Sequence, residues 1–369
     1  MAALPLPLLS ADDRVEQSNP LAPESGPRDI RSVRTLRISV TDRCNFRCVY
    51  CMPEDKLDWT PRDHLLSFEE IRQVVRAAVG HGIGGFKLTG GEPLVRQDIA
   101  GLVALLRAIP GVRELSMTTN GALLATQADS LRRAGLDRLT VSLDTMQPER
   151  FREITRGAEI ASVLEGIGAA RAAGFRHPKI NCVAMRGIND DEYADFARWT
   201  LDRDVTVRFI EYMPLGRTAL GGDYERRFIS EEIIRGRIEE RLGPLETAAP
   251  DTGHGPANVF RLAQGGMGDG GRALGRIGFI SAMSKPFCST CNRLRLTAEG
   301  QLRSCLFDGG EVELRPILRG EPNAFGGRGD DEPSGATAGA LHQAFVDCVA
   351  FKPEVHSYFG NRQMSQIGG

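Results

Sequence analysis

Several features that would assign this chain of 369 residues to a functional class are missing from it. No apolar run approaches the roughly 20 residues needed to span a bilayer. The net charge is only −2, so neither nucleic acid nor an anionic membrane surface is expected as a partner. A basic n-region of a signal peptide is absent, and so is the G-x4-G-K-[ST] loop that cradles nucleotide phosphates. With 41% apolar and 25% charged residues, the chain has an ordinary globular composition, and we expect it in the cytoplasm.

Cysteine is present, but its spacing is not that of a secreted disulfide-rich domain. Three of the eight cysteines form a C-x3-C-x2-C group: Cys44, Cys48 and Cys51. No fourth cysteine or histidine follows at the spacing of a structural zinc site. Three thiolates on a four-iron cluster leave one iron open to a substrate or cofactor. The group therefore favours an iron–sulfur site, with zinc and a disulfide loop as alternatives.

A second group far downstream is also incomplete. Cys288, Cys291 and Cys305 are spaced C-x2-C-x13-C, again without a nearby fourth partner. Zinc is a stronger alternative here, because C-x2-C is a common zinc half-site and a distant ligand such as His254 could complete it. A second trio of this kind in one chain favours a second four-iron cluster. The two remaining cysteines, at positions 182 and 348, lie in apolar segments and are expected in the core.

Short apolar strands alternate with amphipathic helices from residue 36 onward. We expect strands at Leu36–Thr41, Phe86–Thr89, Glu114–Thr119, Arg138–Leu143, Lys179–Met185 and Thr206–Met213. We expect helices at Phe68–Val79, Ile99–Ala108, Leu123–Ala134, Ile160–Ala173 and Glu192–Leu201. Six consecutive β/α units predict a parallel sheet. Six rather than eight units predict an α/β fold of the incomplete (β/α)6 barrel type, with a C-terminal extension that carries the second cysteine group.

Composition shifts along the chain suggest three parts. Residues 1–30 are expected to form a flexible tail, residues 31–245 the partial barrel, and residues 246–369 the C-terminal region with the second trio. Two stretches rich in Gly, Asp or Pro, Gly265–Arg272 and Gly320–Gly339, are typical of mobile surface insertions.

Polar motifs follow the second, third and fourth predicted strands, where parallel α/β folds bind their ligands. They are Thr89-Gly90-Gly91-Glu92-Pro93, Thr118-Thr119-Asn120-Gly121 and Ser142-Leu143-Asp144. The paired glycines permit close backbone approach to a ligand, and the short polar side chains can bind a ribose or a carboxylate. Taken alone, each motif could equally be a turn or a helix cap.

Four arginines lie on predicted strands, where barrel interiors are normally apolar. They are Arg37, Arg208, Arg293 and Arg295. The last two are two residues apart, so both point to one face of a strand. Converging guanidinium groups would form a cationic pocket that matches phosphate geometry.

The cysteine loop after the first strand, together with the glycine motif, resembles the signature of the radical S-adenosylmethionine (radical SAM) enzymes. In that family the open iron chelates the amino and carboxylate groups of S-adenosylmethionine, and one electron releases a 5′-deoxyadenosyl radical. The family also uses a partial (β/α)6 barrel. The resemblance implies S-adenosylmethionine contacts for eight residues: Tyr50, Gly90, Gly91, Glu92, Thr118, Ser142, Arg156 and Met213.

Further segments narrow this resemblance to the GTP 3′,8-cyclases of molybdenum cofactor biosynthesis. They are Thr41–Cys48, Phe209–Met213, Gly278–Ser281, Pro286–Thr297 and the terminal Gly368-Gly369. The resemblance implies cyclisation of GTP to (8S)-3′,8-cyclo-7,8-dihydroguanosine 5′-triphosphate with two [4Fe-4S] clusters and S-adenosyl-L-methionine. It also implies an electron donor, transfer of the product to cyclic pyranopterin monophosphate synthase, and a monomer or homodimer.

The same resemblance implies which residues bind GTP: Arg37, Lys87, Lys179, Arg208, Arg293, Arg295, Gly368 and Gly369. It gives catalytic roles to the first cysteine trio, to Arg293 and to Arg295, and it places the guanine edge at the second cluster. Two positions depart from the family pattern, which commonly reads Lys-Ile-Arg before its Thr-Gly-Gly-Glu-Pro motif. Here Gly85 replaces the lysine and Lys87 replaces the arginine, so the predicted phosphate contacts lack one planar guanidinium group.

Two other functions fit parts of the pattern. A radical enzyme with an auxiliary cluster, such as a peptide-modifying maturase, would have both cysteine groups but would not need the arginines. A zinc-stabilised binding protein would need only the cysteines. Metal analysis separates the last alternative, because two clusters predict about eight irons and eight sulfides per chain, whereas zinc sites predict about two metals and no sulfide.

Overall fold

Six β/α units form the first two thirds of the described chain. The computed structural model describes residues 26–54, 59–249, 255–263, 273–308, 310–320, 335–357 and 359–367. The strands are β1 (Thr35–Ser39), β2 (Gly85–Thr89), β3 (Glu114–Thr119), β4 (Arg138–Ser142), β5 (Lys179–Ala184) and β6 (Thr206–Glu211). The helices between and after them are α1 (Phe68–Gly80), α2 (Ile99–Arg107), α3 (Leu124–Arg133), α4 (Pro148–Thr155), α5 (Ile160–Ala172) and α6 (Tyr193–Asp202). Each predicted strand and helix is confirmed to within two residues at either end.

The C-terminal region extends the same sheet at both edges. Its strands are β7 (Leu245–Thr247), β8 (Asn258–Leu262), β9 (Arg276–Ile280), β10 (Arg293–Leu296), β11 (Gln301–Arg303) and β12 (Glu311–Glu313). The strand order is β12-β11-β10-β1-β2-β3-β4-β5-β6-β9-β8-β7. β10 runs parallel to β1 and β9 runs parallel to β6, while the outermost strands pair antiparallel. The expected incomplete barrel with a C-terminal extension is confirmed, and two strands of the extension continue the parallel part of the sheet.

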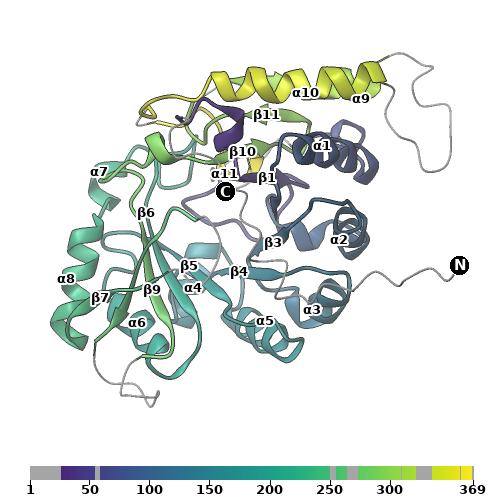
Figure 1. Cartoon of the computed structure of the whole chain (residues 1–369). Helices are drawn as coiled ribbons and strands as arrows, with labels where there is room; N and C mark the ends of the chain where they lie inside the picture. The colour runs from purple at the N-terminus through teal and green to yellow at the C-terminus, as the bar shows by residue number, and fades with distance from the viewer. Residues whose placement is uncertain are drawn as a thin grey trace, which may run out of the picture.

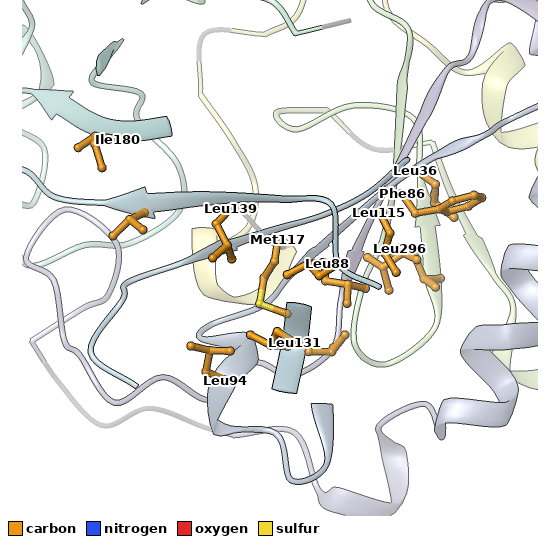
Figure 2. Close-up of a cluster of buried hydrophobic side chains, with 14 of the residues drawn as sticks. Leu36, Phe86, Leu88, Leu94, Leu115, Met117, Leu131, Leu139, Ile180 and Leu296 are labelled. Carbon is orange, nitrogen blue, oxygen red and sulfur yellow. The ribbon is translucent and has the colours of Figure 1, made fainter. Parts of the chain in front are cut away.

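The hydrophobic core lies between the strands and the surrounding helices, which Figure 1 shows on the outer side of the curved sheet. Along β1 and β2, Leu36, Ile38, Phe86 and Leu88 are at most 1% exposed, and Figure 2 shows three of these side chains packed in one cluster. Because side chains alternate across a strand, this register turns the intervening residues toward the barrel interior. The sequence of these strands therefore assigns apolar residues to the outside of the barrel and polar residues to its inside.

Further helices complete the chain. They are α7 (Tyr224–Arg227), α8 (Glu231–Leu242), α9 (Arg315–Arg319), α10 (Gly335–Ala350) and α11 (Met364–Ile367). The predicted insertion at Gly320–Gly339 is wrong in its last part, because residues 335–339 form the start of α10. That helix packs on α1, where the rings of His81 and Phe345 are 5.7 Å apart. Residues 265–272 and 321–334 lie outside the described residues, and within the described part no helix has the length and apolarity required to cross a membrane.

Candidate active site

The first cysteine trio lies in the loop that follows β1, at the carboxyl end of the parallel strands. The Phe46 N–H donates to Cys44 Sγ over 3.4 Å, and Asn120 Nδ2 lies 3.8 Å from the same sulfur. Burial raises the pKa of the Cys44 thiol to about 11 and that of Cys51 to about 12. Such thiols keep their protons unless a metal replaces them, since metals bind the thiolate form. Buried sulfurs that receive N–H groups suit an iron–sulfur cluster.

The glycine-rich turn after β2 clamps the backbone of this loop. Gly91 N–H donates to the Thr41 carbonyl over 2.7 Å, and Glu92 N–H to that of Arg43 over 2.8 Å. A Cβ on Gly91 would lie 2.3 Å from the Asp42 carbonyl oxygen. Glycine is therefore required here for packing of the turn against the cysteine loop, a constraint that comes in addition to the ligand approach expected from the sequence.

Arg156 holds the other side of the loop. Its Nε donates to the Arg47 carbonyl, and its Nη2 donates to the carbonyls of Met52 and Pro53 over 2.9 Å each. It also ends α4 in a left-handed conformation, with φ of 58°. Arg156 does not line the cavity described below, and its bonds support the cysteine loop. The contact with S-adenosylmethionine that the family resemblance implies for it stays a prediction.

Two buried carboxyl groups fix the strand ends beside the loop. Glu92 accepts from Leu94 N over 3.0 Å, from Thr119 Oγ1 over 2.6 Å and from Asn120 N over 2.6 Å. Burial nevertheless raises its pKa to about 7. Asp144 accepts from the Tyr50 hydroxyl over 2.8 Å, and burial raises its pKa to about 6. These bonds join the ends of β2, β3 and β4 to the cysteine loop.

The second cysteine trio lies at the opposite end of the barrel. Cys288 and Cys291 precede β10, and the carbonyl of the next residue, Asn292, accepts from the N–H groups that enter β1. Burial raises the pKa of Cys291, but Arg293 and Lys352 outweigh that effect and leave it below its usual value. The Lys352 ammonium also donates to the Cys291 carbonyl over 2.7 Å. This trio is therefore set in a more positive environment than the first.

The described residues offer no ready-made site for a single metal ion. Among the described residues, no three His, Cys, Asp or Glu side chains are grouped so that they could hold one ion. Tetrahedral zinc at about 2.3 Å from each sulfur needs its thiolates within roughly 4 Å of one another, whereas a four-iron cluster holds them farther apart. His254, the suggested fourth zinc ligand, lies outside the described residues.

A row of cations crosses the barrel interior between the two trios. In the strand register Arg295 on β10 lies beside Arg37 on β1, which lies beside Lys87 on β2. Burial, and then the neighbouring arginines, lower the pKa of Arg37 well below its usual value, and burial lowers that of Arg295 to about 10. Burial, Arg208 and Arg37 likewise lower the pKa of Lys87.

Part of this positive charge has no carboxylate partner in the described part of the chain. Among the described residues, Arg37, Lys87 and Arg208 form no ion pair with a carboxylate. Burying charges without partners is costly, and a polyanionic ligand would remove that cost. Lys179 on β5 lies beside Thr140 of β4 in the strand register, and its pKa falls to about 8 through burial and through repulsion by Arg208 and Arg138.

One continuous cavity connects the two ends of the barrel. Its lining includes most of the residues predicted from the sequence: Arg37, Cys44, Cys48, Tyr50, Cys51, Lys87, Gly90, Gly91, Glu92, Thr118, Ser142, Arg208, Met213, Cys288, Cys291, Arg293, Arg295 and Cys305. Lys179 and Arg156 do not line it. Gly368 and Gly369 lie outside the described residues. The predicted core residues Cys182 and Cys348 are confirmed as fully buried.

Other lining residues were not predicted from the sequence. They include Asn181, Glu211, His356, Met364 and Ser365. Glu211 accepts from the N–H groups of Met283 and Ser284 over 2.9 and 2.8 Å, which fixes the loop before Cys288. The backbone of Ser365 in α11 bonds to Cys51, so the C-terminal segment reaches the first trio. Of these residues, only Asn181 could have been found from the sequence, because it lies on a predicted strand of the barrel.

A partial parallel barrel with an open cysteine trio after its first strand, and a glycine turn after the second, defines a radical SAM enzyme. The model of the Radical SAM superfamily matches residues 38–200, and that of Molybdenum Cofactor Synthesis C matches residues 205–326. The fold is similar to that of Streptococcus suis SuiB bound to precursor peptide SuiA. That structure has a TM-score of 0.52 at 12% identity, with 88% of this chain and 66% of that chain covered.

Closer similarity is found to curated GTP 3′,8-cyclases. The cyclase of Pelotomaculum thermopropionicum is 43% identical over 92% of this chain and 98% of its own length. That of Moorella thermoacetica is 46% identical over the same shares. That of Pseudomonas entomophila is 44% identical over 89% of this chain and 91% of its own length. The chain belongs to the GTP 3′,8-cyclase family.

Proposed function

We propose that this protein converts GTP to (8S)-3′,8-cyclo-7,8-dihydroguanosine 5′-triphosphate, the first step of molybdenum cofactor biosynthesis. The observation that carries the proposal is the row of buried cations between two open cysteine trios in one cavity. Two of these cations, Arg37 and Lys87, form no ion pair with a carboxylate among the described residues. Guanidinium and ammonium groups in that position bind a triphosphate. Membership of the cyclase family identifies its base as guanine.

Cys44, Cys48 and Cys51 would hold one [4Fe-4S] cluster and Cys288, Cys291 and Cys305 the other. With S-adenosylmethionine bound at the first site and an external electron donor, this cofactor set would supply the radical chemistry that removes hydrogen from C3′ of GTP and joins C3′ to C8 of guanine, with one electron for the cleavage of S-adenosylmethionine and one further electron and one proton for the product.

The residues of the chain position the cysteine loop and the substrate, and they exclude water from the cavity. Gly91 and Arg156 hold the first cysteine loop, and the bond from Tyr50 to Asp144 fixes the aromatic ring beside Cys51. The cations orient the triphosphate, so that two carbon atoms of the same substrate are held within bonding reach. Burial on both sides of the cavity shields a reactive intermediate from solvent.

The partners follow from the same proposal. An electron donor must supply the reaction, and an enzyme that takes the cyclised nucleotide, cyclic pyranopterin monophosphate synthase in this family's pathway, consumes the product. None of the eight cysteines, all of which lie in the described part of the chain, forms a disulfide bond. Free thiols and thiolate clusters require a reducing compartment, which supports the cytoplasm as the site of action.

The test is anaerobic production of 5′-deoxyadenosine by the reconstituted, reduced protein with and without GTP. Strong stimulation by GTP, with deuterium moving from C3′ into 5′-deoxyadenosine, is the expected result. Cleavage of S-adenosylmethionine that ignores GTP would support another radical reaction, such as peptide modification. Absence of cleavage at full iron content would contradict the role of the first trio.

A further inference from the structure

One buried hydroxyl lies between two of the unbalanced cations. Thr140, in the middle of β4, is 2% exposed. Its Oγ1 accepts from Lys87 Nζ over 3.2 Å and from Arg208 Nη2 over 3.3 Å. These donors come from β2 and β6, so a single oxygen atom on β4 joins side chains from opposite parts of the barrel. A hydroxyl has two lone pairs, and both are directed at cations here.

This contact has a specific electrostatic consequence. The ammonium and the guanidinium repel each other, and neither pairs with a carboxylate among the described residues. A carboxylate at position 140 would hold both groups but would also cancel their charge. A neutral hydroxyl holds both groups and leaves the charge available to a ligand. Arg208 Nε, buried and without a partner in the described part of the chain, is an unused donor beside it.

Lys87 has the greater need for such a contact. A lysine ammonium is a point charge at the end of a flexible stem, while an arginine presents a planar fork with fixed donor directions. The bond to Thr140 restricts the ammonium to one direction before a ligand arrives. Immobilising a flexible side chain in advance lowers the entropy lost on binding.

We propose that Thr140 is a positioning residue of the triphosphate site, whose hydroxyl holds Lys87 and Arg208 at a fixed separation for the phosphate groups of the substrate. The inference rests on the proposed function, because it assigns the cations to a triphosphate. Thr140 acts through the two cations and does not itself line the cavity.

The test compares ligand affinities of the anaerobically reconstituted protein by calorimetry, with GTP, GMP and S-adenosylmethionine as separate ligands. Thr140→Val keeps the shape and the strand propensity of the residue but removes the acceptor. We expect GTP to bind about tenfold more weakly, equal to about 1.4 kcal/mol. S-adenosylmethionine should bind as before, and GMP should lose less affinity than GTP. Thr140→Ser, which keeps the hydroxyl, should restore binding of GTP.

A matched control is Thr200→Val in α6. Thr200 is fully buried and its hydroxyl donates only to the Ala197 carbonyl over 2.7 Å, so the same substitution removes a buried hydroxyl outside the site. It should leave all three affinities unchanged. If Thr140→Val fails to retain its iron and its circular dichroism spectrum, Thr140→Ala is measured with the same expectation.

The outcomes separate this inference from the proposed function. GTP binding within twofold of wild type in the Thr140 variants, equal losses for GTP and GMP, or no rescue by serine would overturn the role of Thr140. A wild-type protein that binds GTP no more tightly than GMP would instead contradict the triphosphate site itself.

Discussion

Binding of GTP should be coupled to the uptake of protons by buried lysines. In the free protein, burial and the neighbouring Arg208 and Arg138 lower the pKa of Lys179 to about 8. A triphosphate close to this ammonium would oppose both effects and raise the pKa toward its usual value of about 10.4. At pH values well below 8 the lysine is charged with or without ligand, so its charge adds no pH dependence there.

Above pH 8 the free lysine is mostly neutral and must gain a proton when GTP binds. A group with a pKa of about 8 is roughly half protonated at pH 8 and roughly one tenth at pH 9, so affinity should fall about fivefold between these values. From pH 9 to 10 it should fall about sevenfold, because the bound lysine with a pKa near 10.4 also begins to lose its proton. The terminal phosphate, with a second pKa near 6, is already fully ionised in this range.

Calorimetry in buffers of different ionisation enthalpy measures the uptake directly. Lys179→Arg is the informative variant, because arginine stays charged throughout the range. It should reduce the uptake and flatten the slope above pH 8, but not abolish them, since the pKa of Lys87 is lowered as well. A GTP affinity that does not change from pH 8 to 10, or a variant identical to wild type in slope, would refute the predicted contact between Lys179 and the triphosphate.

Three further predictions concern the supports of the site. Gly91→Ala places a Cβ 2.3 Å from the Asp42 carbonyl oxygen, which should displace the first cysteine loop. Iron analysis should then find about four irons per chain in place of about eight. A value of eight irons would contradict the packing argument. Arg156→Ala should lose iron from the first cluster while the second keeps its own, whereas full iron content with weakened S-adenosylmethionine binding would support the contact predicted from the sequence. Glu311→Gln removes the carboxylate partner of the fully buried Arg303; urea unfolding should show a loss of about 3 kcal/mol, and a loss under 1 kcal/mol would show that Arg303 is satisfied by its bond to Asn361.

The first six strands and five of their helices were predictable because their signals are local. Apolar and polar residues alternate in Leu36-Arg37-Ile38, which indicates a strand, and the structure has β1 there. A capping box formed by Ser67 and Glu70 indicates the start of a helix, and the structure contains it. The pairing of β10 with β1 could not be read in this way, since Arg295 and Arg37 are separated by more than 250 residues. The start of α10 was missed because glycine disfavours helices, and its packing on α1 outweighs that local preference.

The residues of the candidate site also fall into those that local sequence patterns predict and those that depend on long-range contacts. The cysteine and glycine motifs can be recognised in the sequence by their spacing. The sequence around Thr140 indicates only a residue that favours strands. Its importance depends on the lengths of two side chains from other strands that reach the same oxygen. Arg156 is another case in which long-range contacts matter: the family resemblance implies a ligand contact, and the structure adds hydrogen bonds to three carbonyl groups of the cysteine loop that no local sequence pattern indicates.

The position of the second trio explains why the barrel interior is polar. Ligands of parallel α/β folds normally lie at the carboxyl ends of the strands, and the first trio follows that rule. The second lies at the amino ends, where Cys291 is two residues before β10. A substrate that reaches both trios must lie along the strands, which are about 16 Å long at 3.3 Å per residue in β1. The interior must therefore carry ligand-binding side chains at mid-strand, and the apolar core is confined to the space between strands and helices.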